Sequence, residues 1–248
     1  MDRPEEVVDD LTTYISEFAE FALASGARYA IPFASNSCYL HPETFRFNET
    51  GQTPQMVSDY FAAQGITSPE LVILLSGDGW SEDSGFEVQD GTWFTERERH
   101  LLEYQQAIEP KLRGQAEKEA DAELTPADFD IFFGSFSKTI PLPLRRFLGR
   151  SPVLYVLKSG DSRHCFEVDI QRGQSKEISA FDDETHPIQI HTSAQLLREC
   201  MELGLFSHLA ISKRVQYRVR AEQYRRLRLL NLALKDMNPH SRCRRCTV

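Results

Sequence analysis

The sequence predicts an α/β first part and an α+β second part that holds an antiparallel sheet. In the first part, amphipathic stretches alternate with short apolar runs in the order helix, strand, helix, strand, which is typical of a layered α/β unit. In the second part, several strand-like runs follow one another and are bordered by helical stretches. The charge-dense segment 115–123 lies between them, so we expect two domains, 1–118 and 119–248.

The first part is expected to begin with a helix over residues 4–25, in which apolar residues recur at helical spacing. Gly26 can adopt the left-handed conformation that ends a helix. A strand over residues 28–34 follows with almost no linker. A second helix is expected from Thr53, which can cap the helix ahead of a first-turn proline, to Gly65.

The rest of the first part alternates in the same way. The apolar run over residues 71–75 has the length of a strand and leads into a glycine-rich turn over residues 76–80. Residues 81–95 are acidic and contain two glycines, so we expect an irregular segment there. A helix over residues 96–123 should follow, kinked or divided at Pro110.

The second part is expected to open with a helix capped by Thr125. Its apolar side carries four phenylalanines at helical spacing: Phe129, Phe132, Phe133 and Phe136. Strands are expected over residues 153–158, 165–170, 176–181 and 186–191, the first two joined as a hairpin. A helix from Thr192 to Gly204 and a leucine-rich helix over residues 221–237 complete an antiparallel sheet with helices on one side.

Composition narrows the class of protein. With 41% hydrophobic residues, the 248-residue chain can bury a sizeable core, and its net charge of -9 argues against general nucleic-acid binding. Neither a secretory leader nor an apolar run of membrane length is evident, so we expect a cytoplasmic protein without a membrane span. The five cysteines are odd in number and scattered, which favours reduced thiols over a disulfide framework.

Charge is unevenly distributed along the chain. The first twenty residues are acidic, whereas arginines crowd the last fifth of the chain. We interpret both as solvated helix faces; the alternative is that the basic face docks an acidic partner or an anionic ligand. The pair Cys243 and Cys246 has redox-motif spacing, but it lies beside the chain end, where we expect disorder.

Candidate site residues lie where the two expected strands of the first part end. The strand over residues 28–34 leads into a loop whose polar side chains could line a pocket: Ser35, Asn36, Ser37, Cys38 and His41. Asp78 follows the second apolar run, between two glycines. The alternatives are a loop histidine at His41 that hydrogen-bonds to backbone or faces water, and a simple Asp-Gly turn at Asp78.

These two strand ends, IPFASNSCYLHPET and LLSGDGW, carry a resemblance that covers about residues 5–113. They resemble the back half of metallo-β-lactamase-fold proteins related to the ascorbate-phosphate lactonase and sialic-acid hydroxylase groups. The resemblance implies half of an αββα sandwich with a zinc or iron site, to which His41 and Asp78 would contribute as metal ligands and catalytic groups. The family's main ligand motif, H-x-H-x-D-H, is absent from the sequence. Either a partner protein carries the N-terminal half and supplies those ligands, which is the interpretation we favour, or the metal site has been lost.

The second part, from Phe129 through IQIHTSAQLLRECMELGLFSHLAIS, resembles a sterol-carrier-protein-type α+β domain. Such domains bury apolar or dimer-forming surface. From both resemblances we expect a subunit of a metalloenzyme that hydrolyses or oxidises a small-molecule substrate. The alternative is a non-catalytic lipid-binding, small-molecule-binding or scaffold protein, in which the four phenylalanines of the first helix of this part line a pocket.

Overall fold

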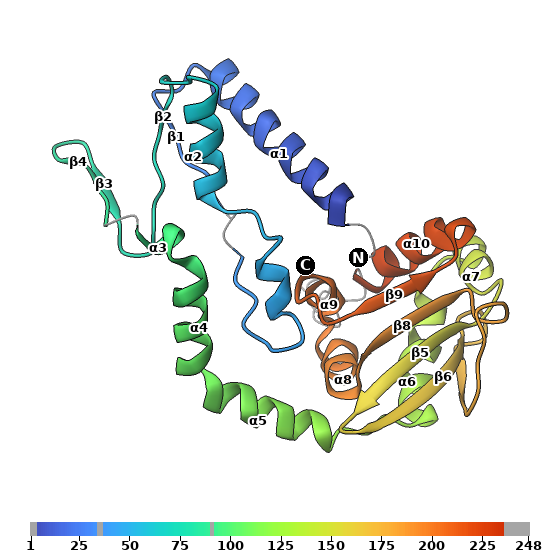
Figure 1. Cartoon of the computed structure of the whole chain (residues 1–248). Coiled ribbons are helices and arrows are strands. Elements are labelled where there is room, and N and C mark those ends of the chain that lie inside the picture. Colours follow the sequence, from blue (N-terminus) through green and yellow to red (C-terminus); the bar gives the residue numbers. More distant parts are fainter. Residues whose placement is uncertain (1–3, 34–36, 90–91, 236–248) are drawn as a thin grey trace, which may run out of the picture. The chain divides into compact units, whose positions relative to one another are not determined.

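The computed structural model describes residues 4–33, 37–89 and 92–235 (Figure 1). The chain divides into two compact units, Met1–Glu109 and Pro110–Val248. The division rests on contacts between residues, so the expected domains 1–118 and 119–248, with their family identities, stay a prediction.

The first unit consists of helices and two short strand pairs. Its elements are α1 (Pro4–Ser25), β1 (Tyr29–Ala30), the 3-10 helix η1 (Phe45–Asn48), α2 (Pro54–Ala63), β2 (Glu70–Leu71), β3 (Gly79–Ser81), β4 (Gly85–Glu87), α3 (Thr92–Thr95) and α4 (Arg97–Ala107). Helices α1 and α2 pack together through Ile15, Ala19, Val57 and Phe61. Two expectations for this unit are confirmed, because α1 has the expected bounds and the Thr53 hydroxyl accepts a hydrogen bond from the backbone N–H of Met56.

The strands of this unit are much shorter than expected. β1 and β2 form a parallel pair of two residues each, whereas the apolar runs predicted strands over residues 28–34 and 71–75. Pro32 has no N–H to donate to a ladder, and Phe33 is 89% exposed, so nothing buries the continuation of β1. The described strands form two separate pairs, and the half-sandwich implied by the lactamase resemblance is not shown.

A hairpin occupies part of the stretch expected to be irregular. β3 and β4 pair antiparallel with Trp80 opposite Phe86, and Gly85 supplies the positive φ of +74° that follows the turn. Both strands are exposed or only half buried, so no alternation of apolar and polar residues marks them in the sequence. The expected division of the next helix is confirmed: α4 ends at Ala107, and Pro110 lies in the first turn of α5 (Glu109–Ala120).

The second unit is built on one five-stranded sheet of order β7-β6-β5-β8-β9 (Figure 1). After α5 its elements are α6 (Pro126–Thr139), α7 (Leu142–Leu148), β5 (Val153–Ser159), β6 (Ser162–Asp169), β7 (Gln174–Ile178), β8 (Ile188–Ser193), α8 (Ala194–Leu203), α9 (Phe206–Ile211), β9 (Gln216–Val219), the 3-10 helix η2 (Ala221–Gln223) and α10 (Tyr224–Lys235). The sheet was expected to be antiparallel, but β5 and β8 pair parallel. β5 and β7 both run antiparallel to β6, and residues 179–187 cross the sheet so that β8 lies beside β5 in the same direction.

The core lies between this sheet and the helices α6, α8 and α10. Alternate residues of β5, such as Val153, Tyr155 and Leu157, face a cluster that contains Phe129 of α6 and Leu230 of α10. The opposite face of β5 packs against a smaller cluster formed with β6 and the segment after β7. The expectation of helices on one side of the sheet is therefore confirmed for these three helices.

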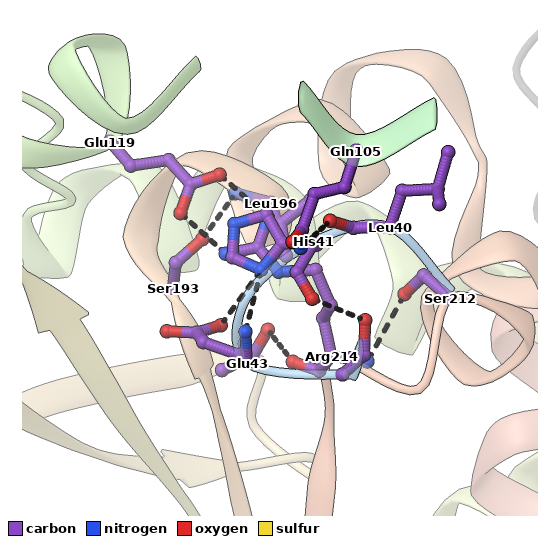
Figure 2. Close-up of polar contacts among 11 residues, drawn as sticks. Leu40, His41, Glu43, Gln105, Glu119, Ser193, Leu196, Ser212 and Arg214 are labelled. Atoms are coloured by element: carbon purple, nitrogen blue, oxygen red, sulfur yellow. Dashed lines mark hydrogen bonds and ion pairs between the residues drawn. The ribbon is translucent and has the colours of Figure 1, made fainter. Parts of the chain in front are cut away.

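Polar contacts hold the end of α5 and the residues that follow it against the sheet. Arg214, in the turn before β9, donates from both terminal nitrogens to the two carboxylate oxygens of Glu119, each at 2.6 Å, and both side chains are mostly buried (Figure 2). The Ser159 hydroxyl at the end of β5 lies within hydrogen-bond distance of the carbonyl oxygens of Ala120 and Ala122. The end of α5 is thus held to β5 and to the strand at the far edge of the sheet.

This ion pair leads to a prediction. Replacing one member, by Glu119→Gln or Arg214→Met, leaves the other buried without its charge partner and should lower the free energy of unfolding by about 3–5 kcal/mol. The double variant should lose less than the sum of the singles, as measured by chemical denaturation. The exposed pair Arg172 and Asp169 is the control, with an expected coupling of about 0–1 kcal/mol. Additive losses at Glu119 and Arg214 would contradict the prediction.

The turn between β6 and β7 touches α6 backbone to backbone. Gly173 has φ +66°, and a Cβ atom there would lie 2.6 Å from the Cα of Gly134 and 2.7 Å from the carbonyl oxygen of Phe133. The Asp130 carboxylate accepts a hydrogen bond from the backbone N–H of Ser175 in the same region. Close packing at this point therefore requires glycine in the turn.

Gly173→Ala should therefore lower the free energy of unfolding by more than backbone strain alone would. We expect a loss of unfolding free energy above about 2 kcal/mol, because backbone strain adds to a clash with α6. Gly160→Ala is the matched control: Gly160 also has positive φ, but its nearest neighbour would lie at 3.5 Å, so only the strain of about 1–2 kcal/mol should appear. If urea denaturation gave the two variants equal losses of unfolding free energy, the contact with α6 would not contribute to stability.

Candidate functional site

The loop after β1 holds some of the predicted pocket residues. Ser37 is exposed and Cys38 is half buried, whereas Ser35 and Asn36 lie outside the described residues. Burial raises the pKa of the Cys38 thiol, and the nearby positive charge of Arg97 offsets this only in part. Cys38 is therefore a neutral thiol near pH 7 and not an activated nucleophile. The pocket-lining role of these four residues stays a prediction.

His41 lies in the same loop, beside Glu43. The Nδ1 atom of His41 accepts a hydrogen bond of 3.3 Å from the backbone N–H of Glu43, and a carboxylate oxygen of Glu43 lies 3.8 Å from it (Figure 2). The neighbouring carbonyl of Leu40 accepts a 2.7 Å hydrogen bond from Gln105 of α4. Helix α4 thereby holds the loop in place, and the predicted catalytic and metal-binding role of His41 remains untested.

Asp78 holds a turn through both of its carboxylate oxygens. One oxygen accepts a 2.6 Å hydrogen bond from the backbone N–H of Leu75, and the other accepts a 2.9 Å hydrogen bond from the backbone N–H of Gln89. These bonds join the apolar run before the turn to the end of the hairpin. The structure thus gives Asp78 the turn-forming part that was its alternative interpretation, and its predicted catalytic and metal-binding role stays a prediction.

Metal-ligand geometry is not found in the described part of the chain. No group of three or more histidine, cysteine, aspartate or glutamate side chains lies together there in a way that could hold an ion. The zinc or iron expected with a partner protein therefore stays a prediction. Cys243 and Cys246 lie outside the described residues.

A different group of polar atoms lies inside the second unit. The strand registers place Phe166, Tyr155, Ile190 and Tyr217 in one row across β6, β5, β8 and β9. Tyr155 is 1% exposed, and its hydroxyl has no hydrogen-bond partner. Cys200 of α8 lies close enough to affect the ionisation of both tyrosines.

All three groups are neutral near pH 7. Burial strongly raises the pKa of Tyr155, and the nearby Tyr217 and Cys200 add to the effect. Burial also raises the pKa of Tyr217, partly offset by a hydrogen bond with Asn231, and raises the pKa of Cys200 to about 11. The Cys200 thiol donates to the carbonyl oxygen of Leu205 at 3.6 Å. This cluster can donate a hydrogen bond to an uncharged acceptor, but it supplies neither a base nor a nucleophile.

The surroundings of the Tyr155 hydroxyl are aromatic and aliphatic. The Tyr155 ring lies 5.4 Å from the ring of Phe129 and 5.6 Å from that of Phe133. Phe129, Phe133 and Phe136 are fully buried and contact other core rings, whereas Phe132 is partly buried against Phe206. Three of the four phenylalanines expected to line a pocket are thus packed in the core.

Sequence reasoning missed Tyr155 for a simple reason. The residue stands inside the apolar run VLYVLK, where a tyrosine is indistinguishable from any other large core residue. Whether its hydroxyl finds a partner depends on β9 and α10, which lie far along the chain. No local sequence pattern reports such a contact.

Comparisons with known proteins found little. No family model matches the chain, and no curated protein matches it. A solved structure titled sterol carrier protein 2 from Yarrowia lipolytica, in its apo form, matches 47% of this chain and 97% of its own, with 11% identity and a TM-score of 0.31. A structure titled UbiJ-SCP2 ubiquinone synthesis protein matches 47% and 99%, with 11% identity and a TM-score of 0.29.

Both neighbours are of the sterol-carrier type that the second part of the sequence resembles, but scores this low carry no argument about fold or function. The lactamase resemblance has no counterpart among these matches. Within the described residues, no helix has the length and apolar character needed to cross a bilayer.

Because the Tyr155 hydroxyl has no hydrogen-bond partner, we expect that removing it stabilises the protein. Tyr155→Phe removes a buried donor that lacks a partner, so the unliganded protein should gain roughly 1 kcal/mol of unfolding free energy. Tyr224→Phe removes the same atom from an exposed ring on α10 and should change stability by less than about 0.5 kcal/mol. Denaturant titration of both variants gives the comparison, and a loss of stability in Tyr155→Phe would show that the hydroxyl has a partner.

Proposed function

We propose that the second unit is a non-catalytic binding module for a small, uncharged and largely apolar molecule. The ligand would lie between the sheet and the helices α6, α8 and α10, with an acceptor oxygen hydrogen-bonded to Tyr155. The observation that carries this proposal is the Tyr155 hydroxyl, which is buried and unpaired in an apolar core.

The free-energy cost of burying this unpaired hydroxyl supports the proposal that a ligand binds there. A buried donor without an acceptor destabilises the folded state by about 1–3 kcal/mol, and phenylalanine would fill the same space without that cost. A ligand with a carbonyl, ether or hydroxyl oxygen would supply the missing acceptor. Because Tyr155, Tyr217 and Cys200 are all neutral, a charged ligand would be left without a counter-charge in this cluster.

Some side chains at the border of this core can adapt to a ligand. Met201 on α8, Leu229 on α10 and Phe132 on α6 pack against the core but are only partly buried. Methionine is flexible enough to change rotamer around a guest molecule. A ligand of modest size could therefore enter by displacing such side chains, without unfolding the sheet.

The hypothesis that the chain is a metalloenzyme subunit remains a separate prediction. It requires a partner chain with the H-x-H-x-D-H motif, and no described cluster of side chains favours it. The binding module requires neither a metal nor a partner, and its chemistry follows from residues of this chain alone.

The binding proposal predicts a co-purifying molecule. Organic extraction of the full-length protein, followed by mass spectrometry, should recover an uncharged, oxygen-containing compound in substoichiometric to equimolar amounts. Tyr155→Phe should retain at least tenfold less of it, because one buried hydrogen bond to the ligand contributes roughly 1.4 kcal/mol. Tyr224→Phe should retain as much as the wild type.

Two outcomes would contradict the proposal. If no compound is recovered from the wild type, and the protein also binds none from a panel of labelled sterols, quinones and fatty alcohols, the module does not bind this class. If Tyr155→Phe retains the compound as well as the wild type, the hydroxyl does not contact it.

A further inference from the structure

Two helices of the second unit that contact each other, α7 and α10, are rich in arginine. Residues 141–152 and 224–235 contain no aspartate or glutamate. They contribute six arginines: Arg145, Arg146, Arg150, Arg225, Arg226 and Arg228. In a chain with a net charge of -9, such a concentration produces a local positive potential that attracts anions.

Arg226 is the unusual member, because it is buried without a counter-charge. It is 3% exposed, and its guanidinium donates only to neutral oxygens: the Ser151 hydroxyl, the Ser151 carbonyl at 3.2 Å and the Pro152 carbonyl at 3.5 Å. Its Nε atom is buried and has no hydrogen-bond partner. Burial lowers the pKa of Arg226, and the like charge of Arg150 lowers it further.

Arg150 is the charged neighbour of Arg226, and Arg145 lies on α7. The Arg145 Nε atom is also buried without a partner, and its Nη1 atom donates at 3.4 Å to the carbonyl oxygen of Ser137. The Arg150 guanidinium lies over the ring of Phe147, 4.9 Å from its centroid. Among the described residues, no carboxylate forms an ion pair with any of these three arginines.

The same unit shows how a buried arginine is otherwise neutralised. Arg214 is similarly buried, and Glu119 contacts both of its terminal nitrogens. An unpaired buried cation costs several kcal/mol, and a second cation beside it adds repulsion. An anion bound at the surface over Arg226 and Arg150 would remove both costs.

We propose that the surface where α7 and α10 meet binds a phosphate group, with Arg150 as its contact and the charge of Arg226 beneath it. Guanidinium groups suit this ligand because their planar arrays of N–H donors match the spacing of phosphate oxygens. The group can come from free phosphate or a phosphorylated metabolite, or from the headgroup of an anionic phospholipid. The chemistry recognised is the same in each case.

The test begins with inorganic phosphate and the full-length chain. Phosphate should raise the melting temperature relative to chloride at equal ionic strength, and isothermal titration calorimetry should give a saturable isotherm. Arg150→Gln removes an exposed contact without touching the core and should weaken phosphate binding at least tenfold. A wild type that responds equally to phosphate and chloride, and whose vesicle binding is unchanged by Arg150→Gln, overturns the proposal.

A matched control separates this site from overall charge. Arg163→Gln makes the same change in net charge at an exposed position, opposite Lys158 at the far end of β5 from Arg150. It should leave phosphate binding within twofold of the wild type. If both variants weaken binding equally, the effect is general screening and the site is rejected.

A second variant addresses Arg226 itself. Arg226→Met removes the buried charge, so in phosphate-free buffer the protein should keep or gain stability, and the stabilisation by phosphate should be lost. If Arg226→Met keeps the phosphate response, the buried charge is not part of the site. The exposed variant Arg150→Gln decides the question even if Arg226→Met does not fold.

Vesicles distinguish the two sources of the phosphate group. The wild type and Arg150→Gln are sedimented with vesicles of phosphatidylcholine, with and without phosphatidylglycerol. Binding that needs phosphatidylglycerol, is lost in Arg150→Gln and is competed by free phosphate supports a lipid headgroup. Saturable phosphate binding without vesicle binding supports a soluble phosphate compound.

Discussion

The second unit depends on β5, whose side chains are buried on both faces of the sheet except at Lys158. The strand pairs with β6 on one side and with β8 on the other, so every neighbouring element is positioned relative to it. Ser151, just before the strand, accepts a hydrogen bond from Arg226, and Tyr155 lies at the centre of the strand. Its last residue, Ser159, donates a hydrogen bond to Ala122, which follows α5. The unpaired hydroxyl and the unpaired arginine therefore share one rigid support.

The buried polar groups of the second unit are of two kinds, those with partners and those without. Arg214 and Glu119 form a bidentate ion pair, and the Ser159 hydroxyl lies between two carbonyl groups, so these contacts stabilise the fold. Arg226 and Tyr155 instead keep donors without acceptors in places where apolar residues would fit. Buried polar groups are nearly always paired, so each exception calls for an explanation such as a bound molecule, water or ion.

Local features of the fold could be predicted from the sequence, and features that depend on distant partners could not. The caps at Thr53 and Thr125 were predictable because a side chain and a backbone N–H three residues away suffice. The apolar run over residues 71–75 predicted a full strand, but only Leu71 of this run pairs in β2, since strand length depends on a neighbour. β9 was missed because its alternation, Tyr217 and Val219 with Gln216 and Arg218, spans only four residues within an arginine-rich stretch interpreted as a helix face. For the site, His41 and Asp78 were chosen from loop position alone, and their roles are untested, whereas Tyr155 gave no signal.

The order of the sheet also determines how the chain meets other copies of itself. β7 and β9 lie at the two edges, and an exposed edge offers unpaired backbone groups to a strand of another molecule. β7 is short and carries Lys176 and Glu177, and β9 is shorter still and carries Arg218. An incoming strand would have to strip water from these charged side chains before it could pair. These charged edges thus disfavour the stacking of strands into fibrils.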